Sequence, residues 1–284
     1  MSFSNHQRLR VAILDMNNNA PNLGLTCIRN QVKLQSGEVN NTFLEYDVFD
    51  VRYKNEVPGL DYDIYISSGG PGSPFEGEEQ EWEQKYFDWL GSVWAHNLDH
   101  DPEDRKHVFL ICHSFQMAVR FFDLGEVVPR KGESFGIFQC EMTDAGRGEP
   151  TFQGLDETFY IADFRSWQVI QPNMARIQGM GAEILCIEQE RPHVPLERAV
   201  MGIRISPEII ATQFHPEADP PGMAWHFIQP NRQQAIKENH GEEKFERIME
   251  RLYDPNFLDR TYRTVLPNFL HQSIRALRPE YELA

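Results

Sequence analysis

The stretch VFLICHSFQ, residues 108–116, decides the fold of this chain. Its first four residues are apolar, the apolar run stops at Cys112, and the residues that follow suit a helix. This pattern predicts a buried strand that turns sharply into a helix. Open α/β sheets place their chemistry at the carboxyl ends of such strands. A thiol held there can act as a nucleophile if a neighbouring group takes its proton, although a lone cysteine at a strand end is more often a core residue.

A second segment offers a base for this thiol. Residues 209–214 (IIATQF) read as another strand, which ends at His215, Pro216 and Glu217 because proline cannot continue a central strand. An imidazole can take the thiol proton, and a carboxylate two residues on can hold the imidazole in the right tautomer. Alone, the same three residues would more often be a surface loop.

A third segment supplies a flexible backbone near the same sheet edge. Residues 64–66 form a short apolar strand, followed by SSGGPGSP at residues 67–74. Glycines there free the backbone to direct N–H groups at a developing oxyanion. In isolation such a loop is only a turn signal.

Together, the three segments resemble those of class I glutamine amidotransferases. That family carries an SGGPG loop, a GxCxGxQ elbow and a QFHPE segment in this order, and here they correspond to residues 68–72, 110–116 and 213–217. The last match is complete over its five residues and is the most specific. The resemblance covers roughly residues 9–220.

The resemblance implies a thiol-dependent hydrolysis of the side-chain amide of glutamine, or of a related γ-glutamyl compound, through a glutamyl thioester. By position, Cys112 would be the nucleophile, His215 the base and Glu217 its orienting partner. The backbone N–H groups of Gly70 and His113 would form the oxyanion hole. No cofactor and no metal ion are implied. The residues expected to contact the substrate are Gly69, Gln116, Arg165, Ser166 and Trp167.

Two segments depart from the family pattern. The elbow has Leu110 and Ser114 where the family has glycines that fit a tight strand-to-helix turn. The family's SHxDxV substrate segment corresponds to residues 164–169 (FRSWQV), where only the valine is kept. Arg165 could meet a substrate carboxylate through its planar fork. These departures leave open a substrate other than free glutamine, or a weakened site.

Composition excludes several classes of function. With 27 Lys and Arg against 43 Asp and Glu, the net charge of −16 disfavours nonspecific nucleic-acid binding. No apolar run approaches membrane length, and the polar residues 1–10 lack a signal-peptide core. A reduced, cytoplasmic compartment suits a working thiol. The cysteines have neither metal-ligand nor disulfide spacing; they are Cys27, Cys112, Cys140 and Cys186.

The order of elements predicts an α/β fold of the flavodoxin-like kind, with a mostly parallel central sheet and helices on both faces. Strands are expected at 9–15, 42–51, 62–67, 108–111 and 209–214, and helices at 21–32, 78–98 and 115–122. Short antiparallel strands are expected at 134–142, 157–162, 167–170, 183–187 and 199–205. We divide the chain into an amidotransferase-like domain, 1–220, and a C-terminal helical extension, 221–284, with helices at 223–239, 242–253 and 259–277.

The sequence leaves the partner and the activity open. Amide hydrolysis would release ammonia for transfer to an acceptor. Nothing in the sequence resembles a nucleotide-binding P-loop, so either a separate synthetase subunit uses this ammonia or the chain only hydrolyses the amide. The nearest resemblance is to the glutaminase part of GMP synthase. A homodimer is also open. The main alternative is a weakened amidotransferase-like fold that binds or regulates. A serine- or dienelactone-type hydrolase suits the sequence less, because there the acid precedes the histidine.

Overall fold

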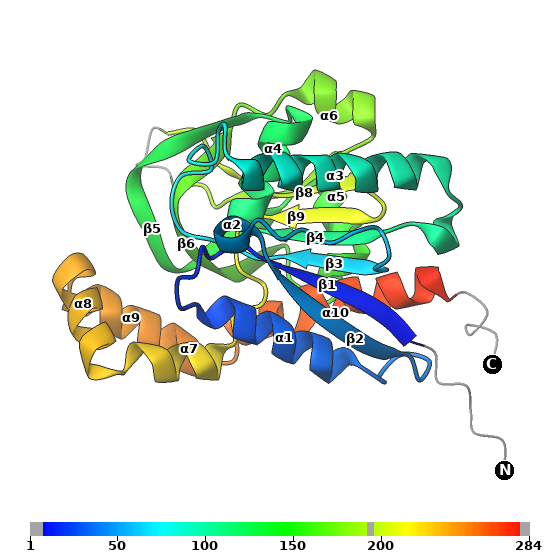
Figure 1. The fold of residues 1–284 in the computed structure, drawn as a ribbon. Helices are drawn as coiled ribbons and strands as arrows, with labels where there is room; N and C mark the ends of the chain where they lie inside the picture. Colours follow the sequence, from blue (N-terminus) through cyan, green and yellow to red (C-terminus); the bar gives the residue numbers. More distant parts are fainter. Residues whose placement is uncertain (1–7, 192–195, 279–284) are drawn as a thin grey trace, which may run out of the picture.

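One sheet of nine strands organises the molecule, as seen in a computed structural model that describes residues 8–191 and 196–278 (Figure 1). The strand order is β2-β1-β3-β4-β9-β8-β7-β5-β6; neighbours from β2 to β9 are parallel and the rest antiparallel. The strands are β1 (Arg8–Asp15), β2 (Phe43–Asp50), β3 (Ile64–Ser67), β4 (His107–Ile111), β5 (Glu126–Met142), β6 (Thr158–Ile170), β7 (Glu183–Glu188), β8 (Val200–Ser206) and β9 (Ile209–Thr212). The α/β architecture predicted from the sequence is confirmed.

Helices cover both faces of this sheet, with α3 and α4 on one side and α1 and α10 on the other (Figure 1). Alternate residues of β1 show why: Val11 and Ile13 join the core with α1 and α10, whereas Ala12 and Leu14 join the core with α3 and α4. The helices are α1 (Leu23–Gln35), α2 (Val51–Lys54), α3 (Glu81–Asp99), α4 (His113–Phe122), α5 (Asp144–Arg147), α6 (Met174–Met180), α7 (Pro220–Phe227), α8 (Pro230–His240), α9 (Glu242–Tyr253) and α10 (Leu258–Leu277).

The antiparallel part is longer than the sequence suggested. The strands expected at 157–162 and 167–170 are one strand, β6, which pairs with β5 along most of its length. The irregularity lies in the partner strand, where β5 has extra residues between Pro129, which pairs with Trp167, and Ser134, which pairs with Arg165. The two-strand prediction was therefore wrong, because the irregularity lies in the pairing and not in a turn.

The C-terminal helices differ from the prediction in one place. The helix expected at 223–239 is two helices, α7 and α8, separated at Gln229 and Pro230. Proline lacks the N–H that continues a helix, and the residue before it favours extended backbone, as Gln229 shows with a ψ of 133°. The break directs α8 away from the line of α7 (Figure 1).

The C-terminal helices pack in two ways. Helix α10 belongs to the core of the sheet, where the ring of Phe269 lies 5.1 Å from that of Phe109 on β4. Helices α7, α8 and α9 instead form a separate apolar cluster against β5 and β6, built on residues such as Met223 and Ile236. Within the described residues, no helix is long and apolar enough to cross a lipid bilayer.

Candidate active site

Cys112 lies where β4 ends and α4 begins. Its backbone has φ 52° and ψ −99°, in the positive-φ region that residues other than glycine rarely adopt. Such a conformation costs about 1–3 kcal/mol and persists only when the surroundings enforce it. Here the Cys112 N–H donates to the carbonyl of Thr212, on the adjacent strand β9, at 2.7 Å. The strained strand-to-helix turn is the geometry of a nucleophile elbow.

His215 meets this thiol from the next strand. It follows β9, and its backbone N–H donates to the carbonyl of Ala162 at 3.0 Å. A Cβ built on Gly69 would lie 2.7 Å from His215 Cε1 and 3.3 Å from Cys112 Cβ, so these two atoms are at most about 6 Å apart. The thiol is close enough to the imidazole to raise the pKa of His215. The carboxyl ends of two adjacent parallel strands thus bring the thiol and the imidazole together.

Glu217 holds the imidazole from its other side. The distance from His215 Nδ1 to Glu217 Oε1 is 2.8 Å, and the Glu217 side chain is 2% exposed. With Nδ1 engaged, Nε2 is the nitrogen available to the thiol. Burial alone would lower the pKa of His215, but the negative charges of Glu217 and Cys112, and hydrogen bonds to both, raise it well above its ordinary value. The ring is therefore suited to hold a proton beside the sulfur.

Helix α1 adds support for the carboxylate. A Cβ built on Gly24 would lie 3.0 Å from Glu217 Oε1, so this glycine lets the carboxylate approach the first turn of α1. The N-terminal end of a helix carries partial positive charge and stabilises an anion placed against it. The sequence did not indicate this contribution.

Replacing Glu217 with glutamine should shift the pH dependence of the reaction. The raised pKa of His215 means that the imidazole stays protonated at neutral pH and loses its proton only as the pH rises through that raised value. If the imidazolium protonates the leaving ammonia, activity falls along this alkaline limb. Because the Glu217→Gln variant lacks the negative charge, its alkaline limb should lie at lower pH. Profiles of kcat/KM against pH check this; an unmoved limb contradicts it, and Glu217→Asp is the charge-retaining control.

The glycine loop lets the backbone come close to the thiol. A Cβ on Gly70 would lie 2.1 Å from the carbonyl oxygen of Met16, so no side chain fits there. The Gly70 N–H makes no hydrogen bond to the described residues, and the His113 N–H begins α4, where helical N–H groups lack intrahelical partners. His113 directly follows Cys112 in the chain, and Gly70 follows Gly69, where an added Cβ would lie 3.3 Å from Cys112 Cβ. They suit the oxyanion that forms when a thiolate attacks an amide.

Gly69 has no side chain, which leaves room for the thiol and the imidazole to approach each other. It does not border the cavity. Gly69→Ala should lower kcat/KM by about 10²-fold, because displacing reactive groups by about an ångström costs that much. Gly132→Ala is the control, because nothing lies within 4 Å of the added Cβ. Steady-state ammonia release checks both variants. Equal activities would show that the close contact at Gly69 has no role in positioning.

Two glutamines form a chain of hydrogen bonds that ends at the sulfur. Gln116 Nε2 donates to Gln213 Oε1 at 2.9 Å, and Gln213 Nε2 lies 3.6 Å from Cys112 Sγ. Gln213 is fully buried, and an N–H directed at the sulfur stabilises negative charge there. The sequence analysis matched Gln213 to the family segment but gave it no role. Its position one residue beyond β9, beside the elbow, was the available signal.

A cavity of about 740 Å³ opens above the thiol. Cys112, His215 and Gln116 border it, together with the predicted substrate residues Ser166 and Trp167. Pockets for small organic ligands span about 300–1,000 Å³, so the space suits a small-molecule substrate. Residues of α7 and α8 close one side; they are Met223, His226, Phe227 and Arg232.

The geometry of the candidate site and the family comparison agree. A family model described as glutamine amidotransferase class-I matches residues 29–229. The chain belongs to the class I glutamine amidotransferases. This span includes the elbow, the glycine loop and the QFHPE segment, and it covers the whole of α7. Among the described residues, no group of His, Cys, Asp or Glu side chains is placed to hold a metal ion.

Solved structures share the fold across three quarters or more of the chain. A glutamine amidotransferase from Thermotoga maritima has a TM-score of 0.64 at 14% identity, covering 96% of this chain and 98% of its own. One from Methylobacillus flagellatus gives 0.63 at 12% identity and 95% of both chains. A protein from Thermoplasma acidophilum, described as a putative GMP synthase subunit, gives 0.52 at 18% identity, with 75% of this chain and 87% of its own covered. No curated protein matches by sequence.

The departures from the amidotransferase elbow are absorbed by packing. Leu110 is fully buried in the core beneath α3 and α4 and does not disturb the turn. Ser114 Oγ donates to the carbonyl of Ser68 and shares a hydrogen bond with Ser67 Oγ, both at 2.7 Å. Serine therefore ties the elbow to the glycine loop, a contact that a glycine cannot make.

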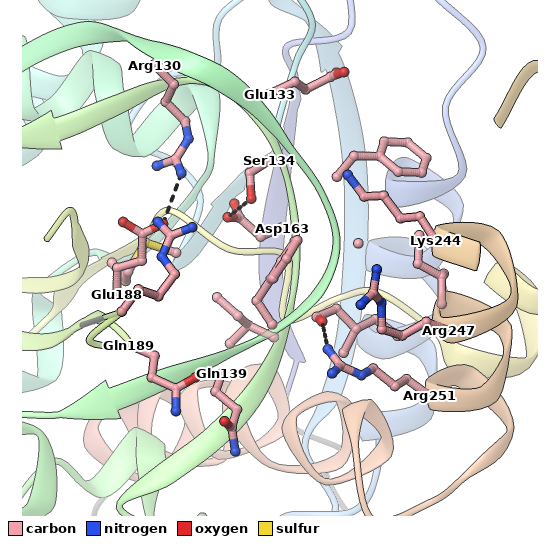
Figure 2. A pocket seen from close by; sticks show the side chains of 18 residues that line it. Arg130, Glu133, Ser134, Gln139, Asp163, Glu188, Gln189, Lys244, Arg247 and Arg251 are labelled. Atoms are coloured by element: carbon pink, nitrogen blue, oxygen red, sulfur yellow. Dashed lines mark hydrogen bonds and ion pairs between the residues drawn. The ribbon is translucent and has the colours of Figure 1, made fainter. Parts of the chain in front are cut away.

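Arg165 does not present its guanidinium to the active-site cavity, although the residue borders it. The side chain is 1% exposed; Nε donates to Asp163 at 2.8 Å, and Nη2 lies 3.4 Å from Glu188. These two carboxylates border a second cavity of about 480 Å³, where Figure 2 shows them close to Arg130. The expected contact between Arg165 and a substrate carboxylate therefore has no free donor group in this conformation.

His113 cannot act as the base despite its place beside the thiol. Its side chain is 1% exposed and does not border the cavity. Burial, with the charges of Arg52 and Arg120, lowers the pKa of His113 to about 3. The imidazole is neutral at physiological pH, which leaves His215 as the imidazole that contacts the thiol.

Proposed function

We propose that this chain hydrolyses the side-chain amide of glutamine, or of a related γ-glutamyl compound, with Cys112 as nucleophile. The observation that carries the proposal is the convergence of Cys112, His215 and Glu217 at the floor of one cavity. Membership of the class I glutamine amidotransferases supports it.

The first half of the reaction breaks the amide bond. The Cys112 thiol gives its proton to His215, and the sulfur bonds to the carboxamide carbon while the carbonyl oxygen takes up negative charge beside the N–H groups of Gly70 and His113. The C–N bond then breaks while His215 gives its proton to the departing nitrogen, which leaves as ammonia. The product on the protein is a thioester between the γ-carbonyl and Cys112.

The second half regenerates the thiol. Water replaces ammonia in the cavity, and His215 takes a proton from it as its oxygen bonds to the thioester carbon. The C–S bond breaks, the sulfur recovers its proton or its pairing with the imidazolium, and glutamate leaves. Glu217 keeps the ring oriented in both halves because its hydrogen bond occupies Nδ1.

The ammonia has a proposed destination outside this chain. We propose that a synthetase uses this ammonia, and the structural likeness to the putative GMP synthase subunit from Thermoplasma acidophilum supports this partner. The competing proposal is a binding or regulatory protein with a catalytically weakened site, which the altered segment at residues 164–169 favours.

Ammonia release separates these two proposals. Purified wild-type protein should release ammonia from glutamine or a γ-glutamyl amide in a coupled assay, at a rate that depends on Cys112. A protein that binds these compounds without releasing ammonia, alone or with a synthetase, supports the binding role and contradicts hydrolysis.

A further inference from the structure

We propose that Arg232 of α8 binds the α-carboxylate of the substrate, so that this chain acts on γ-glutamyl compounds whose α-carboxylate is free. This inference rests on the proposed function, because it names the substrate class of the same cavity. It also gives the helices α7 and α8 a role as one wall of the substrate site.

Few charged side chains border the active-site cavity, and most already have a partner or another role. Arg165 is committed to Asp163 and Glu188, and His215 to Glu217 and Cys112. Burial and the neighbouring charge of Arg232 lower the pKa of His226, so its ring is neutral at physiological pH. Arg232 is the remaining permanent cation among the described residues that border this cavity.

The Arg232 side chain has no ion pair or hydrogen bond within the described structure, although the chain carries 43 acidic residues. Of the acidic residues that border the cavity, Glu217 is bound to His215, and Glu133 lies 3.8 Å from His240. An arginine at the mouth of a concave site, with its guanidinium unengaged, can accept an anion without breaking an existing pair. A guanidinium matches a carboxylate through two parallel hydrogen bonds.

The packing of helix α8 fixes the backbone position of Arg232. The Arg232 backbone N–H donates to the carbonyl of Gln229 at 2.9 Å in the first turn of α8. On the same helix Ile236 is buried in the cluster that joins α7 and α9 to β5 and β6. The break at Pro230 turns α8 away from the line of α7, and Arg232, in the first turn of α8, borders the cavity.

The position also complements the altered segment at residues 164–169. In that segment, Ser166 and Trp167 border the cavity, but its only cationic side chain, Arg165, forms an ion pair with Asp163.

A glutamyl substrate has its carboxamide at one end and its α-carboxylate at the other. With the carboxamide at Cys112, we place the α-carboxylate at Arg232, in the part of the cavity lining that α7 and α8 supply.

The kinetic test compares two substrates and four proteins. For wild type, glutamine should be preferred over glutamine methyl ester, which lacks the α-carboxylate charge. Arg232→Gln should raise KM for glutamine by about tenfold or more with kcat nearly unchanged, because the contact is the same in ground and transition states. The variant should lose the preference over the ester, and Arg232→Lys should restore part of it. Arg263→Gln, an exposed arginine on α10, is the charge-matched control.

The outcomes separate this inference from the proposed function. Active Arg232→Gln protein with unchanged KM and unchanged preference overturns the Arg232 assignment and leaves hydrolysis standing. If wild type releases no ammonia, hydrolysis fails, and calorimetric binding of glutamine to Cys112→Ala decides the inference alone. Affinity lowered about tenfold or more by adding Arg232→Gln supports it. Equal affinity, or no binding to Cys112→Ala, overturns it.

Discussion

Replacing Cys112 with serine is expected to lower kcat for ammonia release by at least about 10⁴-fold, the scale of loss when a nucleophile is removed from a triad. Serine preserves the shape of the elbow but offers a far weaker nucleophile, since a hydroxyl does not form the anion that a thiol forms beside an imidazolium. Steady-state assays with glutamine measure the loss, and thermal unfolding shows whether the fold is kept.

The matched control for this prediction removes a different thiol. Cys186 lies in the core of the sheet and does not border the cavity, so the kcat of Cys186→Ala should stay close to that of wild type. If Cys112→Ser retained comparable activity with an unchanged fold, another group would have to be the nucleophile.

Replacing His215 with asparagine should cost a similar factor, because the thiol and the imidazole act as one unit. Without the ring, neither the proton for the leaving ammonia nor the base for the attacking water remains. The double variant Cys112→Ser/His215→Asn is therefore expected to be no slower than the slower single variant. Rates for the four proteins of this cycle measure the coupling.

The control for His215 is His100→Asn, an exposed histidine at the end of α3. It should keep wild-type activity. Independent, multiplying losses at Cys112 and His215 would contradict the arrangement in which one proton moves between them.

The positions of the residues proposed as catalytic could be predicted because they follow strands. Cys112, His215 and the loop at Gly70 each come directly after a buried apolar run, and parallel strands bring their carboxyl ends to one edge of the sheet. The pairing of β3 with β4 and of β4 with β9 then places these segments side by side. Pattern and topology together sufficed for this part.

The surroundings of the site could not be predicted in the same way, because they depend on side-chain packing. Arg165 forms ion pairs with Asp163, two residues away, and with Glu188 on β7. Only the pairing of the strands brings these carboxylates to Arg165, so the sequence could not show that its guanidinium binds them and not the substrate. The same holds for Gln213, whose amide reaches the sulfur of Cys112. The division of α7 from α8 was different, since Pro230 signals it in the sequence.

The helices after residue 220 show a further limit. Their amphipathic patterns are visible, but not which surface each covers. Phe269 on α10 packs on the central sheet, whereas Met223 on α7 borders the active-site cavity. Long-range contacts decide these positions, and a single sequence does not display them.

Covalent trapping tests the central claim most directly. A glutamine analogue that carries a chloroketone or diazoketone in place of the carboxamide is incubated with the protein, and the modified peptide is found by mass spectrometry. We expect one adduct, on Cys112, and none on Cys27, which borders the same cavity but whose pKa is raised to about 12 by burial. No adduct, or an adduct on Cys27 with Cys112 unmodified, would contradict the account.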